Sequence, residues 1–303
     1  MGPLLFLIFI NDLPTLFENC EYLLFADDLK IFKVISEPND SHCLQRNLTI
    51  VNKWCKANGM SLNIEKCAII SFTKRNVIEL FDYEIDSIKL KRVELIKDLG
   101  IIFDQRMSFK PHIDKIVSSG YSILGFVKRR AKEFNDPHIT KSLYCSLVQS
   151  SLEYASVIWA PYYQIDSKRI ESVQKQFLLF ALKPLGFQGF HLPSYESRLL
   201  LLNMTTLENR RELASVLFAF DILRGNIKIK NLSDRIKLKV NNYALRNRRL
   251  LIEDLHCNNF VFNDTISKSI RIFNKYSDFY DCNISRDTFK KRVSQKFKTL
   301  FNS

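Results

Sequence analysis

Two adjacent carboxylates, Asp27 and Asp28, lie between two apolar runs of the sequence at 22–25 and 29–32. Each run is predicted to form a short strand. Because the side chains of a strand point alternately to its two faces, paired acids fit best where the chain turns between strands. The pattern predicts a hairpin whose tip presents carboxylates to solvent or to a metal ion. A solvated acidic turn is the alternative interpretation of the same residues.

Charge is unevenly distributed along the chain. Residues 1–110 contain 14 Lys and Arg against 15 Asp and Glu, which leaves 31 of the chain's 45 basic and 17 of its 32 acidic residues for 111–303. A cationic surface releases counterions from phosphate backbones, so the second part is a candidate for binding nucleic acid. A solvated basic surface on an ordinary soluble protein is an equally good explanation of the charge alone.

Cysteine spacing and apolar runs restrict the class of protein. The seven cysteines show no CxxC pair and no spacing matched to histidine, which disfavours a zinc finger and a disulfide framework and indicates a reducing compartment. The apolar run from Leu4 to Ile10 is too short to span a membrane and lacks the flanks of a signal peptide. We expect it to form a buried helix, and we expect no membrane partner.

Hydrophobic periodicity predicts a mixed α+β region followed by helices. In the first region the predicted elements are a helix from Asp40 or Ser41 to Asn58-Gly59, a buried strand at 67–72, further strands within 77–90 and a strand at 99–103. Beyond Pro111 the predicted helices cover 113–127, a segment starting near Pro137, 167–182 and 207–223, with a basic connector at 228–249. The run 183–186, Lys-Pro-Leu-Gly, is the best candidate for a further boundary.

The order of several motifs closely resembles that in the reverse transcriptases of non-LTR retrotransposons, the LINE-type elements and especially the jockey-like group. The motifs are GPLLFLIFINDLP at 2–14, FADD at 25–28, NGMSLNIEKC at 58–67, and DLG at 98–100 with FKPHI at 109–113. Weaker similarity continues in SLEY at 151–154 and VQKQF at 173–177. The resemblance implies a partial polymerase palm of antiparallel strands and packed helices at 1–110. It also implies an all-helical remainder, with a thumb-like region at 111–183 and a basic C-terminal region at 184–303.

The resemblance also implies roles for individual residues in RNA-directed DNA synthesis, which uses two Mg²⁺ ions, an RNA template, a DNA primer and deoxynucleoside triphosphates. Asp27 is the expected direct metal ligand, and Asp28 is expected to assist at longer range. Lys66 is a candidate proton donor or charge stabiliser for the departing pyrophosphate. The residues expected to contact primer or template are Phe25, Leu99, Gly100, Lys128, Arg129, Arg130 and Lys132. The alternatives are a core aromatic residue for Phe25, an exposed lysine for Lys66, an ordinary hairpin turn for Leu99-Gly100 and a solvated helix face for the four basic residues.

The sequence departs from the family at its amino end. Met1 falls inside a family motif, so the fingers, an earlier metal-binding aspartate and a glutamine-glycine loop are expected to be missing. We therefore expect an N-terminally truncated reverse transcriptase that is inactive by itself. A nonenzymatic nucleic-acid-binding remnant and an inert product of a decayed element are the alternatives. The family and the lack of a recognisable secretory segment imply a nuclear or cytoplasmic location, and the sequence does not predict the oligomeric state.

Overall fold

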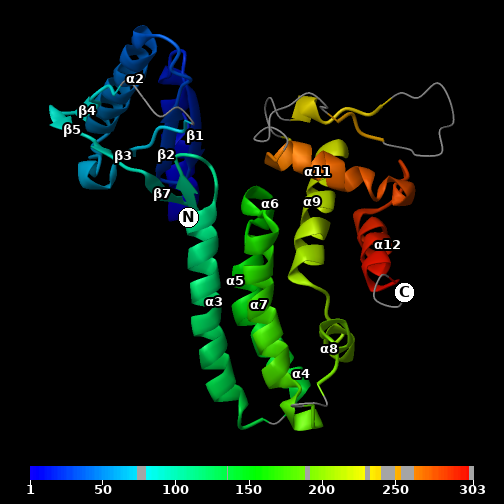
Figure 1. The fold of residues 1–303 in the computed structure, drawn as a ribbon. Coiled ribbons are helices and arrows are strands. Elements are labelled where there is room, and N and C mark those ends of the chain that lie inside the picture. The colour runs from blue at the N-terminus through cyan, green and yellow to red at the C-terminus, as the bar shows by residue number, and fades with distance from the viewer. Residues whose placement is uncertain are drawn as a thin grey trace. The chain divides into compact units, whose positions relative to one another are not determined.

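The structure of the protein, a computed structural model, describes residues 1–73, 80–134, 136–187, 192–228, 233–239, 250–253 and 263–299. It forms two compact units, Met1–Ser108 and Phe109–Ser303, each described by itself below (Figure 1). The predicted α+β class is confirmed, because helices and strands both occur. The expectation that the C-terminal region is all helical is wrong in one detail, since Leu238 and Leu251 form an isolated antiparallel bridge. The boundary near 183–186 stays a prediction.

The first unit begins with helix α1 (Gly2–Ile10) and the short 3₁₀ helix η1 (Leu13–Leu16). The helix is present as predicted, but the expectation that it is buried is wrong, since Leu4 is 63% and Ile8 67% exposed and only Ile10 is buried. Every residue of α1 after Gly2 is apolar or proline, so no polar face is available to point outward. Ile10 and Leu13 join a small core with residues of α2 and Phe6 packs partly against it, while most other residues of the helix are exposed.

Helix α2 (Pro38–Ala57) begins earlier than the predicted Asp40 or Ser41. Pro38 occupies the first turn, where its fixed φ suits a helix, and Asp40 caps the turn from within. The backbone N–H groups of Ser36 and Glu37 donate to Oδ2 of Asp40 at 2.9 and 3.0 Å. These hydrogen bonds hold the pKa of Asp40 below its usual range. The predicted stop is confirmed, because α2 ends at Ala57 and Gly59 has a positive φ of 69°.

The strands that the structure describes in the first unit form four two-stranded sheets. Three are antiparallel, β1 (Glu21–Phe25) with β2 (Asp28–Phe32), β4 (Glu84–Ile85) with β5 (Ile88–Lys89), and β7 (Leu95–Asp98) with β8 (Ile101–Asp104). The fourth pairs β3 (Ala68–Ile69) with β6 (Lys91–Arg92) in parallel, which departs from the expected antiparallel palm.

Two predicted strands are shorter than expected. The segment 67–72 contributes only β3, because the 3₁₀ helix η2 (Ile64–Lys66) directly precedes it and the partner strand β6 is itself two residues long. The strand predicted at 99–103 begins at Ile101, since Leu99 and Gly100 have positive φ values of 43° and 89° and form the turn. Part of the region predicted at 77–90, up to residue 79, lies outside the described residues.

The second unit is built on long helices. The α3 helix (Lys110–Ala131) lies beside α7 (Gln164–Ala181), and between them the chain forms α4 (Pro137–Leu143), a π-helical turn η3 (Tyr144–Gln149), α5 (Ser150–Glu153) and α6 (Ser156–Trp159) (Figure 1). The predicted helices at 113–127 and 167–182 are confirmed. The α3 helix packs tightly at Gly120, because a Cβ there would lie 3.1 Å from Leu152 Cδ2 and the leucine side chain would have to shift. Tyr144 stacks on Phe177 with ring centroids 4.0 Å apart.

The rest of the second unit packs around α9. The 3₁₀ helix η4 (Lys183–Leu185) and α8 (Tyr195–Leu201) lead to α9 (Leu207–Leu223), which coincides with the helix predicted at 207–223. After the 3₁₀ turn η6 (Ser233–Arg235), the helices α11 (Thr265–Asn274) and α12 (Arg286–Thr299), with η7 (Ser277–Phe279) between them, contact α9 or its core. Phe220, Phe273 and Phe289 are among the large buried rings of this core. Most of the predicted basic connector lies outside the described residues.

Helices in the described part of the chain are either too short or too polar to cross a lipid bilayer.

Candidate active site

The acidic pair lies where predicted, at the tip of the hairpin formed by β1 and β2. Phe25 pairs with Asp28 in the antiparallel register, so Ala26 and Asp27 make a two-residue turn. Ala26 has a positive φ of 52°, a conformation that costs an L-residue with a Cβ about 1 kcal/mol or more. The turn therefore contains local strain beside the two carboxylates.

The hairpin has one packed face and one solvated face. Leu24, Leu29 and Ile31 point to the small core that includes Val51 and Trp54 of α2. Side chains alternate along a strand, so the residues next to these three in sequence point to the opposite face. That face carries Leu23 opposite Lys30 and Phe25 opposite Asp28. Phe25 is 61% exposed, so its interpretation as a core aromatic residue is wrong in this structure.

Asp27 and Asp28 are both exposed. Neither side chain forms a hydrogen bond or ion pair with any residue that the structure describes. Their oxygens are consequently available to a cation, and an exposed oxygen donor set that leaves room for water suits Mg²⁺. In the described part of the chain, however, no three His, Cys, Asp or Glu side chains gather in a group that could hold a metal ion. The two carboxylates therefore fit as some of the ligands of a metal site, but they do not make a complete site by themselves.

An ion pair joins the acidic hairpin to the hairpin of β7 and β8. Lys30 of β2 lies two residues after Asp28, and its Nζ is 2.7 Å from Oδ1 of Asp98 at the end of β7. Asp98 directly precedes the Leu99-Gly100 turn, so the structure places this turn beside the strand that carries Asp28. The sequence marks Asp98 as the first residue of the DLG motif, but nothing in it indicates that Lys30, 68 positions earlier, is its partner.

Lys66 ends the 3₁₀ helix η2 and is exposed. Its backbone N–H donates to Oδ1 of Asn63 at 3.2 Å, which fixes the turn, while its side chain contacts no described polar group. The structure thus leaves the Lys66 ammonium group available, as the predicted role requires.

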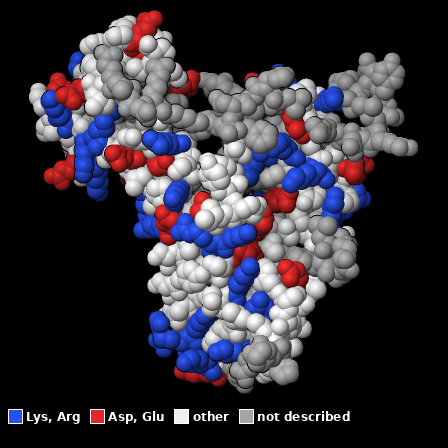
Figure 2. Space-filling model, in the orientation of Figure 1, with Lys and Arg blue, Asp and Glu red and all other residues white. Residues whose placement is uncertain are grey.

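The basic residues Lys128, Arg129 and Arg130 occupy the last turn of α3, and Lys132 follows that helix in the second unit. On the face shown in Figure 2, Lys and Arg side chains gather around this end of α3. Burial, followed by the nearby charge of Lys183, lowers the pKa of Lys128. Arg130 lies over the ring of Phe126, 5.7 Å from its centroid. The cations crowd one helix end, where an anionic partner would relieve their repulsion.

Comparisons with known proteins give one family and several relatives. Residues 1–127 match the family model described as "Reverse transcriptase (RNA-dependent DNA polymerase)". The "Probable RNA-directed DNA polymerase from transposon BS" of Drosophila melanogaster is 25% identical over 187 residues, which are 58% of this chain and 21% of that protein. The same organism's "Probable RNA-directed DNA polymerase from transposon X-element" is 22% identical over 188 residues, 58% of this chain and 20% of that protein.

A third relative is the "RNA-directed DNA polymerase from mobile element jockey" of Drosophila funebris. It is 30% identical over 129 residues, 39% of this chain and 14% of that protein. The chain therefore spans about a fifth or less of the length of these relatives. No solved structure matches the chain.

Proposed function

Because residues 1–127 of this chain match the reverse transcriptase family model, we propose that Asp27 and Asp28 supply carboxylates to the metal site of an RNA-directed DNA polymerase. The proposal rests on two exposed carboxylates at the hairpin tip, inside the segment that matches the family model. Neither forms a hydrogen bond or ion pair with a described residue. The relatives that the chain resembles are polymerases of non-LTR transposons, and the substrates would accordingly be an RNA template, a DNA primer and deoxynucleoside triphosphates.

Each residue of the hairpin has its own part in the proposed site. Asp27, in the turn, would hold Mg²⁺ directly, and Asp28, in the strand, would assist from its fixed position in the register. When bound, the metal ions stabilise the attacking and leaving oxygens of nucleotidyl transfer. The exposed ring of Phe25 lies on the same face as Asp28 and would pack against the primer end.

Two further segments support this geometry. Lys30 and Asp98 hold the Leu99-Gly100 turn next to β2, so the turn would contact the primer backbone close to the carboxylates. The exposed ammonium group of Lys66 would donate a proton or stabilise the charge of the departing pyrophosphate.

We further propose that another carboxylate, from outside this chain, completes the metal site. Two dications in such a site lie about 3.5–4 Å apart and share several oxygen ligands. The described residues offer no group of three suitable side chains. The chain by itself, given Mg²⁺, a primed RNA template and deoxynucleotides, is then expected to extend no primer. Extension that survives purification and is lost in Asp27→Ala would overturn this part of the proposal.

A chimera tests the assigned function directly. The matched segment of the jockey polymerase is replaced by the corresponding residues of this chain, and RNA-templated primer extension is measured. The chimera is expected to extend the primer, and Asp27→Asn in it should reduce the rate at least about 100-fold. Glu21→Gln, at the opposite end of the same hairpin, is the matched control and should leave the rate within about twofold. Equal rates for Asp27→Asn and the control would refute the role of Asp27.

Nucleic-acid binding without catalysis is the second candidate function. It is favoured by the surplus of basic residues in 111–303, which hold 31 Lys and Arg against 17 Asp and Glu. Binding of the whole chain to a primed RNA template, followed by fluorescence anisotropy, should weaken steeply as salt rises. Replacing Lys128, Arg129 and Arg130 together with Gln should weaken binding and flatten the salt dependence. If the chimera is inactive while this binding persists, the second function replaces the first.

A further inference from the structure

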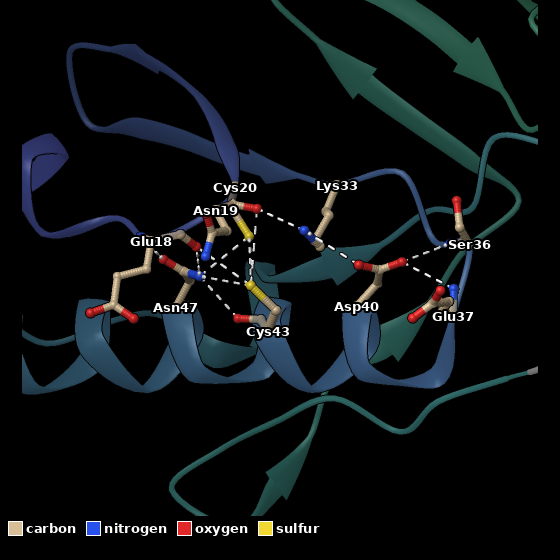
Figure 3. Close-up of polar contacts among 9 residues, drawn as sticks. All are labelled: Glu18, Asn19, Cys20, Lys33, Ser36, Glu37, Asp40, Cys43 and Asn47. Carbon is tan, nitrogen blue, oxygen red and sulfur yellow. Dashed lines mark hydrogen bonds and ion pairs between the residues drawn. The ribbon is translucent and has the colours of Figure 1, made fainter.

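Two thiols from different segments of the first unit lie in contact. Cys20 belongs to the irregular stretch between η1 and β1, Cys43 lies on α2, and their Sγ atoms are 3.9 Å apart (Figure 3). A disulfide requires about 2.05 Å, so the two sulfurs must approach by roughly 1.9 Å. Cys20 is in no helix or strand, and its segment can make this adjustment without breaking a ladder of hydrogen bonds.

A buried amide fixes the two cysteines in this arrangement. Asn47, fully buried on α2, lies one helical turn after Cys43. Its Nδ2 lies 3.2 Å from Cys20 Sγ and 2.9 Å from the carbonyl oxygen of Glu18, and its Oδ1 accepts from the backbone N–H of Glu18 at 3.0 Å. Asn47 thus ties the segment that carries Cys20 onto the helix that carries Cys43. The hydrogen bonds of Asn47 therefore keep the two thiols close to each other in the folded chain.

The thiol pair is accessible to small molecules. A cavity of about 540 Å³ is lined by Cys20 and Cys43 together with Lys33, Asp40 and Arg46. Cys20 is half-buried and Cys43 is buried, so an oxidant meets Cys20 first. The ion pair of Lys33 with Asp40, 3.4 Å between Nζ and Oδ1, lies beside the pair of thiols (Figure 3). Among the described cysteines, no other two are joined by a thiol contact.

We propose that Cys20 and Cys43 are a dithiol that peroxide oxidises to an intramolecular disulfide. The thiolate of Cys20 attacks one oxygen of the peroxide, the O–O bond breaks, and a sulfenic acid and one water result. The sulfur of Cys43 then attacks Cys20 Sγ, the S–S bond forms, and the second water leaves. Two thiols lose two electrons and two protons, and hydrogen peroxide is reduced to two waters. A thiol reductant restores both cysteines by thiol–disulfide exchange and is itself oxidised to a disulfide.

The disulfide would have a defined mechanical effect. It links the segment that enters β1 to α2 and encloses the whole β1–β2 hairpin, including Asp27 and Asp28, in a covalent ring. Closing this ring restricts the unfolded chain and not only the folded one. Oxidation would therefore stabilise the first unit and restrain the movement of the acidic hairpin relative to α2.

Peptide mapping tests the proposal on the whole chain. Reduced protein is treated with hydrogen peroxide at pH 9, the remaining thiols are blocked with N-ethylmaleimide in denaturant, and the chain is digested with trypsin without reduction. Cleavage after Lys30, Lys33 and Arg46 gives a linked peptide of residues 1–30 with 34–46, each holding one cysteine. We expect this species to contain most of Cys20 and Cys43, and to disappear on reduction.

Variants and a melting experiment separate proximity from general reactivity. Cys43→Ser and, independently, Cys20→Ser should abolish the linked peptide, while the exposed-thiol control Cys282→Ser should leave its yield unchanged. Oxidation should raise the melting temperature of the wild-type chain by about 5 °C and that of neither cysteine variant. Oxidation in guanidinium should spread the links over several cysteine pairs. Recovery of Cys20 and Cys43 as separate maleimide adducts, linkage of Cys20 to another cysteine, or an equal yield in guanidinium would each overturn the proposal.

Discussion

Asp27 and Asp28 are neighbours in the chain but occupy different backbone environments. Asp27 belongs to the two-residue turn, whereas Asp28 begins β2 and is paired with Phe25. A residue in a turn can follow a metal ion as the site closes, while a residue in a ladder keeps its position. This difference supports the assignment of Asp27 as the direct ligand and of Asp28 as the assisting group.

The ionisation of Cys20 yields a prediction at the scale of a single thiol. Burial, together with the hydrogen bond and charge of Cys43, raises the pKa of Cys20 from 9.0 to about 11, although Lys33 and Arg46 act in the opposite direction. At pH 8 the folded chain should therefore alkylate at Cys20 about 100-fold more slowly than the chain in denaturant, because only the thiolate reacts. The rate should rise about tenfold per pH unit from pH 8 to pH 10, as measured by mass spectrometry of the peptide 1–30. A plateau above pH 9 would contradict the raised pKa.

The hairpin turn yields a prediction at the scale of one element. Ala26 has a φ of 52°, which glycine adopts without a steric penalty. Ala26→Gly should therefore stabilise the chain by about 0.5–1 kcal/mol in urea unfolding, although glycine also gains entropy in the unfolded state. The control is Ala57→Gly in α2, where the backbone is helical and the same change should destabilise by up to about 1 kcal/mol. Destabilisation of equal size in both variants would show that the turn is unstrained.

The start of α9 depends on a buried carboxylate from α7. Glu171 accepts hydrogen bonds from the backbone N–H groups of Leu207 at 3.1 Å and Glu208 at 3.3 Å, and from the hydroxyl of Tyr195. Glu171→Gln should destabilise the chain by about 2–3 kcal/mol, because the amide NH₂ would face these donors. Glu208 is an exposed acid in the first turn of α9, and Glu208→Gln should change the free energy of unfolding by less than about 0.5 kcal/mol.

The pH dependence of this pair of variants has a definite sign. Burial, the largest effect, raises the pKa of Glu171 above its ordinary value of 4.5. The folded chain then binds a proton at Glu171 more tightly than the unfolded chain does, so the stability from this group is present below 4.5 and is lost as the pH rises through the folded value. The difference in the free energy of unfolding between wild type and Glu171→Gln should consequently decrease as the pH rises above 4.5. Urea unfolding at several pH values measures this difference, and an increase with pH would show that the pKa of Glu171 is lowered.

Features set by neighbours in the chain could be predicted from the sequence, whereas contacts between distant segments could not. The hairpin at Asp27-Asp28, the stop at Gly59 and the whole of α9 follow from local turn chemistry and periodicity. The ion pair of Lys30 with Asp98 and the contact of Cys20 with Cys43 join segments whose separation carries no local signal. The burial predicted for α1 was wrong, because an apolar run indicates burial but not whether a covering partner exists.

At the scale of the whole molecule, the two units differ in how they are stabilised. The first has two-stranded sheets, a small core around Trp54 and an uncovered apolar helix α1. Isolated two-stranded sheets are only marginally stable in water. The second has long helices with fully buried aromatic rings, among them Phe177, Phe220 and Phe289. We expect the first unit to open more readily, because fewer apolar contacts hold it together.

Limited proteolysis measures this difference. The division between the units falls after Ser108, so trypsin should cut after Arg106 and chymotrypsin after Phe109, while the second unit survives longest. The persistent fragment is expected to begin at residue 107 or 110, and its amino end can be read by mass spectrometry. Trypsin cannot cut between Lys110 and Pro111, which makes the two start sites distinct. A protected fragment covering residues 1–108 instead would show that α1 and the small sheets form the more stable unit, and the expected order of unfolding would be reversed.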